Sequence, residues 1–371
     1  MSLTESLINQ LRQHGDLPFV DFMQQALYAP HFGYYSAGLQ KFGPQGDFIT
    51  APELTPLFGQ TLAKQCQQVL STQTNPIVFE FGAGSGQLCV DILTHLEHLH
   101  CLPIEYHIME VSANLRHRQQ ALIQAKLPHL FDRVKWLSQW PQEPFNGVII
   151  ANEVLDAMPV HRFMQTQEGL MESYITVDPQ SNLHEVFKPS TNPRLIAHID
   201  GVLPIGLPLP YQSEVNLFLD DWLAHCHDML TSGAFFIVDY GFPRHEYYHP
   251  DRSQGTIMCH YQHHSHTNPL AHPGEEDITA HVDFTHVAEA AHQAGFHIAG
   301  FVNQASFLLA NGILDLLAAI NDERQRITGQ QAVKQLLQAN EMGELFKVIG
   351  LTKQIDLSLT GFQLHDKRAS L

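Results

Sequence analysis

The stretch Pro76-Ile-Val-Phe-Glu-Phe-Gly-Ala-Gly-Ser-Gly-Gln87 decides the fold class of this 371-residue chain. Residues 76–81 are apolar except for Glu80 and predict a buried strand, and residues 87–99 predict a helix. The glycines between them allow a tight turn and let a ligand approach the backbone without meeting a Cβ atom. A strand, a glycine-rich turn and a helix in this order are typical of a nucleotide-binding α/β domain.

Further short apolar strands are predicted downstream of this unit, at 104–111, 133–137, 147–151 and 234–238. Helices are predicted over 112–126 and 284–294, and the last strands over 296–302 and 345–352. Continuous apolar strands that alternate with helices indicate a parallel sheet covered on both faces. The predicted fold is therefore α/β, a doubly wound and mostly parallel sheet with an N-terminal helical region and insertions.

The chain divides into six predicted segments. Residues 1–72 hold helices at 3–13, 19–28 and 53–71 with a Gly- and Pro-rich loop at 36–52, and 73–155 form the first part of the core. Residues 156–212 are an insertion, with a hairpin around Glu168-Gly169 and a Pro-rich segment. The second part of the core is 213–301, with a helix at 213–230 and a His-rich loop at 241–283. A helical insertion (302–342, helical over 306–340) and a last strand with a tail (343–371) follow.

Composition narrows the function classes. Lys and Arg total 20 against 38 Asp and Glu, a formal charge of -18, which argues against a nucleic-acid binder. No apolar run is long enough to span a bilayer, and no targeting segment is recognisable at the N-terminus, so a cytoplasmic location is expected. The His-rich loop contains His260, His263, His264, His266 and His272, but no HExxH or paired-Cys spacing supports a metal site, and none is predicted.

The spacing of the glycine turn favours a cationic nucleoside ligand. A dinucleotide fingerprint, GxGxxG, would place its third glycine at position 87, where Gln87 stands, and the pattern here is ExGxGxG. A carboxylate at Glu80, two residues before the first glycine, suits the ammonium and sulfonium of S-adenosylmethionine better than a pyrophosphate. The candidate cofactor-binding residues of this loop are Glu80, Gly82, Ala83, Gly84, Gly86 and Gln87.

The ends of the next strands supply further candidates for this cofactor. Glu110, followed by Val111, ends the second strand, where an acid can accept both ribose hydroxyls. NAD sites use an acid at the same place, so Glu110 supports nucleoside binding without distinguishing the two cofactors. Adenine is expected near Leu137 and Ser138, at the end of the third strand.

Residues 152–159 (Asn-Glu-Val-Leu-Asp-Ala-Met-Pro) follow the fourth strand at the same edge of the sheet. Glu153 and Asp156 share a face if the segment is helical, and two carboxylates on one face could hold a guanidinium. The alternative is a helix N-cap by Asn152, with favourable acids in the first turn. Asp239 and Tyr240 follow the fifth strand at this edge and are candidate substrate-pocket residues.

Together these residues resemble the MidA-type (mitochondrial dysfunction protein A) family, which is related to mitochondrial complex I assembly factors. The resemblance covers about residues 18 to 355. It is carried most specifically by 43–53 (Gly-Pro-Gln-Gly-Asp-Phe-Ile-Thr-Ala-Pro-Glu) and 152–159, with support from 28–35, 239–241 and 277–283.

The resemblance implies a class I S-adenosylmethionine-dependent methyltransferase, and some members are linked to protein arginine methylation. It adds Glu53 as a third catalytic carboxylate beside Glu153 and Asp156, Asn152 as a residue near the cofactor, and Asp47 and Thr50 as pocket residues. Residues 152–155 differ from the Asn-Pro-Pro-Tyr motif of amide and adenine N-methyltransferases, and the two-glutamate hairpin of common protein arginine methyltransferases is missing. An arginine acceptor is thus implied by the family and not by the motif.

The resulting hypothesis is in-line methyl transfer from S-adenosylmethionine to an arginine nitrogen of a protein partner, with a respiratory complex I subunit as the partner that the family implies. Two alternatives stay open: a cofactor-binding assembly factor without turnover, and an NAD-dependent oxidoreductase. The sequence does not determine the oligomeric state, and a homodimer is one option.

Overall fold

The computed structural model describes residues 2–36, 50–262 and 264–371. Its centre is an eight-stranded sheet with strand order β15-β16-β10-β5-β2-β3-β4, and β14 pairs with the end of β10. All pairs from β4 to β10 are parallel, whereas β16 runs antiparallel to both β10 and β15. The predicted mostly parallel α/β sheet is therefore confirmed. The strands are β2 (Ile77–Phe81), β3 (Glu105–Met109), β4 (Val134–Leu137), β5 (Phe145–Asn152), β10 (Leu230–Phe242), β14 (Val282–Asp283), β15 (His297–Asn303) and β16 (Phe346–Lys353).

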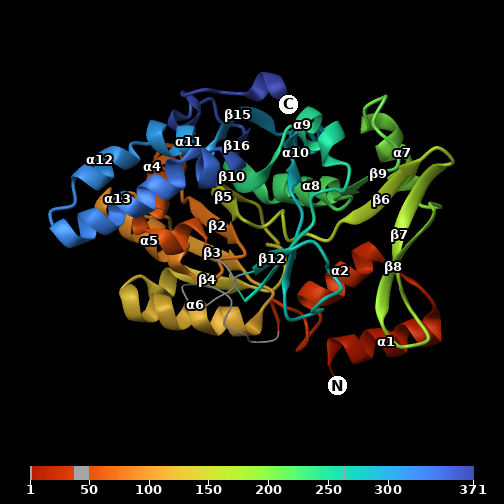
Figure 1. Ribbon diagram of the computed structural model, residues 1–371. Helices are drawn as coiled ribbons and strands as arrows, with labels where there is room; N and C mark the ends of the chain where they lie inside the picture. The colour runs from red at the N-terminus through yellow and green to blue at the C-terminus, as the bar shows by residue number, and fades with distance from the viewer. Residues whose placement is uncertain (1, 37–49, 263) are drawn as a thin grey trace.

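Helices cover both faces of this sheet, as Figure 1 shows. Successive residues of each strand point to opposite faces, so Val78 and Val148 pack into one core while Phe79 and Ile149 pack into the other. The first core is covered by α4 (Pro56–Leu70), α5 (Gln87–His98), α6 (Ala113–Lys126), α11 (Gln304–Ala310), α12 (Ile313–Ala318) and α13 (Glu323–Leu337). The second is covered by α8 (Leu219–Met229) and α10 (Phe284–Ala294).

The segment inserted after β5 forms, together with β1 from the N-terminal region, a second, antiparallel sheet of order β1-β7-β6-β9, with β8 paired to β7. Its elements are β1 (Leu17–Pro18), β6 (His161–Thr166), β7 (Gly169–Val177), β8 (Leu183–Pro189), β9 (Tyr211–Val215) and α7 (Pro193–Val202). The hairpin predicted around Glu168-Gly169 is the connection between β6 and β7. Helices α1 (Leu3–His14) and α2 (Phe19–Tyr28) pack against these strands, at the opposite side of the molecule from α12 and α13 (Figure 1).

Three sequence-based assignments need correction. The helix predicted over 213–230 is strand β9 followed by α8, since Asn216 accepts a hydrogen bond from the Phe218 backbone and turns the chain between them. Residues 241–283 are not one loop but contain α9 (Arg244–Tyr247), β11 (Met258–Tyr261), β12 (His264–His266), β13 (Asp277–Thr279) and β14. These strands are too short to show an alternating pattern. The helix predicted over 306–340 is divided into α11, α12 and α13.

The predicted helix at 53–71 also begins later than expected. A short turn of helix, α3 (Ala51–Leu54), precedes α4, which starts at Pro56. The Thr55 hydroxyl accepts a hydrogen bond from the Leu57 backbone and caps α4, and Pro56 needs no hydrogen-bond acceptor at the first helical position. This arrangement brings Glu53 next to the glycine turn, as described below.

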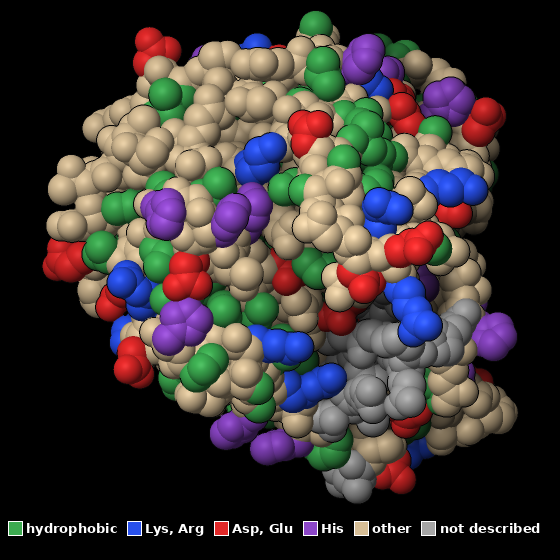
Figure 2. Space-filling model, turned by 90° about the vertical axis from the view of Figure 1, so that its left-hand side faces the viewer, with side chains coloured by type: hydrophobic (Ala, Val, Ile, Leu, Met, Phe, Trp, Pro, Cys, Tyr) green, Lys and Arg blue, Asp and Glu red, His purple; other side chains and the backbone are tan. Residues whose placement is uncertain are grey.

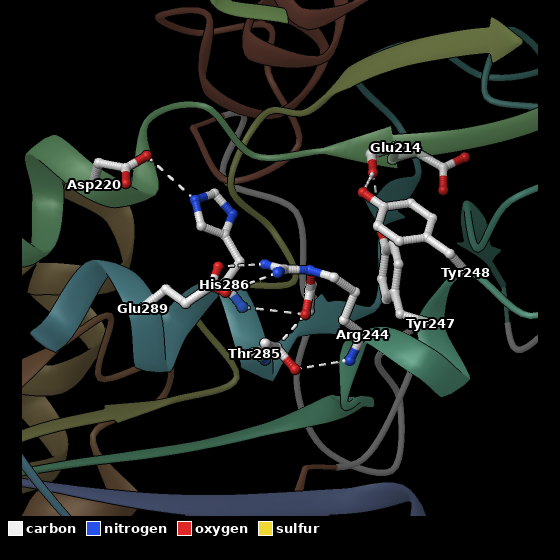
Figure 3. A network of polar contacts seen from close by, with 9 residues as sticks. Glu214, Asp220, Arg244, Tyr247, Tyr248, Thr285, His286 and Glu289 are labelled. Atoms are coloured by element: carbon white, nitrogen blue, oxygen red, sulfur yellow. Dashed lines mark hydrogen bonds and ion pairs between the residues drawn. The ribbon is translucent and has the colours of Figure 1, made fainter. Parts of the chain in front are cut away.

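An ion-pair network holds the chain just beyond the end of β10 (Figure 3). The Arg244 guanidinium donates to Asp283 at 3.2 Å and to Glu289 on α10, and the Arg244 backbone N–H donates to the Thr285 hydroxyl at 2.9 Å. His286, the next residue after Thr285, donates from Nε2 to the Asp220 carboxylate at the start of α8 at 3.2 Å. The network therefore fixes the carboxyl end of β10 against α10, where the candidate residues Asp239 and Tyr240 lie.

Arg244→Met is expected to lower the free energy of unfolding by about 3 kcal/mol, because it leaves the buried Asp283 carboxylate without its cation. Thermal and urea denaturation would measure the loss. Lys188→Met, which removes an exposed ion pair with Asp16, is the matched control and should change stability by less than about 1 kcal/mol. Equal effects of the two substitutions would contradict a structural role for the network.

Charges of both signs cover the surface. On the face that Figure 2 shows, Lys and Arg side chains lie among Asp, Glu and His side chains. Within the described residues, the helices are too short or too polar for any of them to cross a membrane.

Candidate functional site

A cavity of about 720 Å³ lies at the carboxyl ends of β2, β3 and β5. Its walls come from the glycine turn after β2, the end of β3, the turn after β5, and the N-terminal segment around α2 and α3. The volume is in the range of small-molecule sites, and the position is the one where open α/β sheets bind ligands. We call this space the acidic cavity.

Within the described residues, the lining of the acidic cavity carries several carboxyl groups and no lysine or arginine. Its acidic residues are Glu53, Glu80, Glu110, Glu153 and Asp156. Among the described residues that line it, none is Lys or Arg, and His31 is the one basic side chain. Closely spaced carboxyls with no fixed counter-ion favour positively charged ligands.

The glycine turn forms the floor of the cavity. Gly82 and Gly84 have φ values of 58° and 53°, a left-handed conformation that side chains disfavour, and the Gly82 backbone N–H donates to the Met109 carbonyl at 3.0 Å. Gly82, Ala83 and Gly84 line the cavity, and their cofactor-binding role stays a prediction. Gly86 instead begins α5, where a Cβ atom would lie 3.2 Å from the Gln119 Cα. Gln87 points away and donates to Asp91 at 2.7 Å.

Glu80 lines the cavity from strand β2. It is almost fully buried, and it accepts a hydrogen bond from the Tyr106 hydroxyl at 2.7 Å. Burial, opposed by the Tyr106 hydrogen bond and supported by the nearby Glu110 carboxylate, raises the pKa of Glu80 to about 8. A cation that enters the cavity would favour the ionised form of Glu80, so this side chain can act as its counter-ion.

Glu110 is held in a fixed orientation at the end of β3. Its carboxylate accepts hydrogen bonds from the Ser112 backbone at 2.8 Å and from the Gln119 side chain at 2.9 Å. Burial raises the pKa of Glu110 above its ordinary value, although these two hydrogen bonds oppose the shift. Val111 follows at the rim with 75% of its surface exposed.

The aromatic part of the lining was not predicted. Leu137 and Ser138, expected near adenine, do not line the cavity, whereas Trp140 and Trp222 do. Trp140 stands three residues past the end of β4, where an aromatic residue could have been recognised as a planar ligand surface. Trp222 comes from α8, and its spacing in the sequence gives no such signal.

The turn after β5, residues 153–156, is called the acid turn. Glu153 has a φ of 53° and its backbone N–H donates to the Val238 carbonyl at 2.9 Å, so the segment is not helical. The alternative interpretation, in which Asn152 caps a helix, is therefore excluded. Asn152 donates to the Glu153 carboxylate at 3.2 Å, and both acids of the turn line the cavity although no helix places them on a common face.

Asp239 and Tyr240 were predicted to belong to the substrate pocket. They lie behind the acid turn and do not line the cavity. The buried Asp239 Oδ2 accepts hydrogen bonds from the Val154, Leu155 and Asp156 backbones at 3.1, 2.9 and 3.3 Å. The Tyr240 hydroxyl donates to Asp156 Oδ2 at 2.6 Å. Asp239 and Tyr240 therefore support the acid turn. The sequence showed only that these two residues and the acid turn follow neighbouring strands.

The acids of the turn share a buried, negatively charged environment. Burial, with the Asp156 charge as the second cause, raises the pKa of Glu153 to about 8. Burial also raises the pKa of Asp156 to about 6, while the Tyr240 hydroxyl hydrogen bond lowers it. The pKa of Asp239 lies well above its ordinary value because of burial and the charges of Asp156 and Glu153.

Two buried acceptor atoms in this region have no partner among the described residues. They are Asp156 Oδ1 and Asn152 Oδ1, and both residues line the acidic cavity. Buried polar atoms are nearly always hydrogen-bonded, so an unpaired acceptor on a cavity wall indicates where a ligand donor binds. The acceptors and the surrounding acids together fit a cation that carries several N–H groups.

The described part of the N-terminal segment lines another side of the cavity. Glu53 and Thr50 line it, and the Ser85 hydroxyl donates to Glu53. Asp47 lies outside the described residues. Tyr28 and Tyr35 also line the cavity, with their rings stacked at 5.5 Å, and neither was assigned a role from the sequence.

The fit to S-adenosylmethionine rests on two features of the cavity. The backbone of the glycine turn leaves room for a close ligand, and Glu80 and Glu110 supply acids for an ammonium and a ribose.

No group of three or more metal-ligating side chains occurs within 2–36, 50–262 and 264–371. In the His-rich region, His266 lies 3.0 Å from Glu276, His272 stacks on Tyr261, and His263 lies outside the described residues.

Curated relatives have similar sequences over nearly the whole chain. The mitochondrial protein arginine methyltransferase NDUFAF7 of Danio rerio is 26% identical, with 93% of this chain and 86% of the relative covered. The human protein of the same name is 27% identical, with 93% and 82% covered. These names contradict the expected cytoplasmic location, because the relatives are named mitochondrial. That expectation rested on two absences, of a membrane-length apolar run and of a recognisable targeting segment, and neither is a positive sign of any compartment.

A solved structure matches still more closely. A protein from Burkholderia thailandensis, crystallised with S-adenosyl-homocysteine bound, is 41% identical with a TM-score of 0.95, and 100% of this chain and 96% of that chain are covered. Residues 58–302, more than half of the chain, match the model of a family described as S-adenosyl-L-methionine-dependent methyltransferases. With the glycine turn and the acidic cavity, these findings identify the chain as a member of that family, an S-adenosylmethionine-dependent methyltransferase.

Proposed function

We propose that this methyltransferase methylates a guanidinium nitrogen of an arginine side chain in a protein. The observation that carries the proposal is the pair of unpaired buried acceptors, Asp156 Oδ1 and Asn152 Oδ1, in a cavity lined by acids and by no described Lys or Arg. A guanidinium presents five N–H donors in one plane and keeps its charge at neutral pH, so it can satisfy both acceptors together. The names of the curated relatives, protein arginine methyltransferases, agree with this acceptor.

The floor of the cavity is the proposed cofactor site. S-adenosylmethionine, when bound, supplies an electrophilic methyl group on a sulfonium. Gly82, Ala83 and Gly84 would leave room for its methionine part, Glu80 would face the ammonium, and Glu110 would accept from the ribose hydroxyls. Trp140 and Trp222 offer aromatic surfaces for adenine.

The acid turn is the proposed acceptor site. Glu153 and Asp156 would accept N–H donors of the guanidinium and draw its positive charge toward themselves, which leaves electron density on the remaining nitrogen. This nitrogen forms the new N–C bond as the S–C bond breaks, and the sulfur leaves as a neutral thioether. The nitrogen then loses one proton, and Glu153 is the proposed proton acceptor. Glu53, on the other side of the glycine turn, would add negative charge near the acceptor.

The proposal is tested by the identity of the methylated residue. Tritiated S-adenosylmethionine and the purified protein are incubated with protein extract from a strain that lacks this enzyme, and the labelled products are hydrolysed and separated. Label in methylarginine is expected with wild-type protein, with little label from the Glu153→Gln variant. Label in methyllysine or in methyl esters would contradict an arginine acceptor, and no incorporation at all would favour a cofactor-binding assembly factor.

The activity should rise with pH. Because the pKa of Glu153 is raised to about 8, its carboxyl is largely protonated at neutral pH before the acceptor binds, and it ionises as the pH increases. We expect kcat/KM to increase about 25-fold between about pH 6.5 and pH 8.5, since this parameter reports ionisations of the free enzyme. Glu153→Gln should flatten this rise in the residual activity. A profile that falls across the same interval would exclude Glu153 as an ionised acceptor ligand.

The partner protein and the oligomeric state stay predictions. The family resemblance implied a respiratory complex I subunit as the substrate, and proteomic comparison of methylarginine in a deletion strain would identify it. A homodimer stays one option, which sedimentation analysis would decide.

A further inference from the structure

Asp239 is a buried carboxylate whose contacts are almost all backbone N–H groups. Besides the three donors of the acid turn on Oδ2, its Oδ1 accepts from the Tyr240 backbone at 2.9 Å. Consecutive N–H groups that converge on one oxygen form an anion-binding concavity of the kind that binds phosphates in other proteins. Here the anion belongs to the protein itself, and it lies on the side of the turn away from the cavity.

This contact holds a backbone conformation that the acid turn would not favour alone. Glu153 has a φ of 53°, in a region that residues other than glycine avoid. Without the Asp239 carboxylate, the N–H groups of Val154, Leu155 and Asp156 would lose their common acceptor in a buried place. The direction in which Glu153 and Asp156 project into the cavity therefore depends on Asp239.

Tyr240 fixes the second acid through its side chain. Its hydroxyl occupies Asp156 Oδ2 at 2.6 Å, so Asp156 Oδ1 is the oxygen left unpaired. The Tyr240 ring is itself packed edge-on against Phe346 and His281. Two consecutive residues of β10 thus hold the same turn, one through the backbone and one through a carboxylate.

The end of β10 is well suited to this task because it is rigidly anchored. Gly241 and Phe242 pair with β14, and the Arg244 network shown in Figure 3 follows at once. From the other side, the Ala280 backbone donates to the Asp156 carbonyl at 2.9 Å, and the Tyr28 hydroxyl donates to the Ala157 carbonyl at 2.9 Å. The acid turn is therefore held between fixed elements.

We infer that Asp239 and Tyr240 are positioning residues of the methyl-acceptor site: they touch neither ligand, and they set the acid turn so that Glu153 and Asp156 Oδ1 face the acceptor. The inference rests on the proposed function, which assigns the acid turn to the acceptor. This role differs from the one predicted from the sequence, in which Asp239 and Tyr240 contact the substrate directly.

The test compares Asp239→Asn and Tyr240→Phe with wild-type protein at saturating S-adenosylmethionine. For Asp239→Asn we expect kcat to fall roughly 100-fold, because the amide sets an N–H group against either the Tyr240 N–H or the donors of the acid turn, and small displacements of catalytic groups have effects of this size. For Tyr240→Phe we expect a fall of about tenfold. In both variants the Kd for S-adenosylhomocysteine, measured by calorimetry, should stay within about threefold of wild type, because the glycine turn is untouched.

A pH profile separates positioning from mere stabilisation. The Tyr240 hydroxyl lowers the pKa of Asp156, so its removal in Tyr240→Phe should move the Asp156 ionisation to higher pH. This ionisation lies on the acid side of the Glu153 rise, so the variant should lose kcat/KM there relative to wild type. Tyr211→Phe is the matched control, because it removes a hydroxyl from a buried tyrosine that donates to the His249 carbonyl away from the cavity. It should leave both kcat and the pH profile unchanged.

Wild-type kcat in both variants, or a parallel loss of turnover and cofactor affinity, would overturn the inference. If Asp239→Asn does not fold, Tyr240→Phe decides alone, because it deletes a single hydroxyl. The proposed function is tested separately, by identifying which amino acid the wild-type enzyme methylates in the labelling experiment. If that amino acid is not arginine, the proposed function fails, but the kcat and Kd comparison of the two variants still tests the positioning role.

Discussion

Glu153→Gln should reduce kcat by at least about 100-fold while the Kd for S-adenosylhomocysteine changes less than about threefold. The substitution keeps the shape of the side chain and removes its ability to become a negative charge and to accept a proton. Glu153 lines the cavity in the acid turn, and its carboxylate accepts a hydrogen bond from Asn152, so an amide of the same length should keep its place. The loss would therefore fall on the methyl-transfer step.

Single-turnover methylation and calorimetry of the same preparation would measure the two quantities. Glu168→Gln in the exposed turn of the β6–β7 hairpin is the matched control, and it should leave both at the wild-type value. Equal losses in turnover and cofactor affinity would show that Glu153 belongs to the cofactor site and not to the acceptor site.

Glu110→Gln is expected to weaken binding of S-adenosylhomocysteine by about 30-fold, which corresponds to about 2 kcal/mol. Charge-assisted hydrogen bonds to both ribose hydroxyls would be lost. The amide also conflicts with one of the two donors that now hold the carboxylate, the Ser112 backbone and the Gln119 side chain. At saturating cofactor, kcat should stay within about threefold of wild type, because Glu110 does not belong to the acid turn.

Isothermal titration with S-adenosylhomocysteine, together with a thermal melt to confirm folding, would give the result. Glu105→Gln, at the opposite end of the same strand, is the control and should bind the ligand normally. An unchanged Kd in Glu110→Gln would remove Glu110 from the ribose site.

The central sheet could be predicted from the sequence because its strands are buried on both faces. Ile77–Phe81 and Phe145–Asn152 are nearly continuous apolar runs, a pattern that surface strands do not share. The glycine turn was recognisable for a related reason, since Gly82 and Gly84 occupy left-handed conformations that other residues seldom adopt.

The acid turn could not be predicted in the same way. A spacing of three residues between Glu153 and Asp156 fits a helix as well as a turn, and nothing in the sequence shows that Glu153 has a positive φ. The role of Asp239 depends on three backbone N–H groups far away in the chain, which leave no trace in composition or periodicity. Trp222 lines the cavity from helix α8, so its place in the lining could not be predicted from the sequence either.

The packing of α1 and α2 against the inserted strands has an evolutionary consequence. Tyr28 at the end of α2 donates to Ala157, 129 positions further along the chain, so two segments that flank the nucleoside-binding part in sequence form one outer layer over it. Changes in that layer can alter which substrate reaches the methyl group while the floor beneath stays constant. Enzymes that descend from one ancestor can in this way change their substrate specificity while the cofactor-binding residues stay the same.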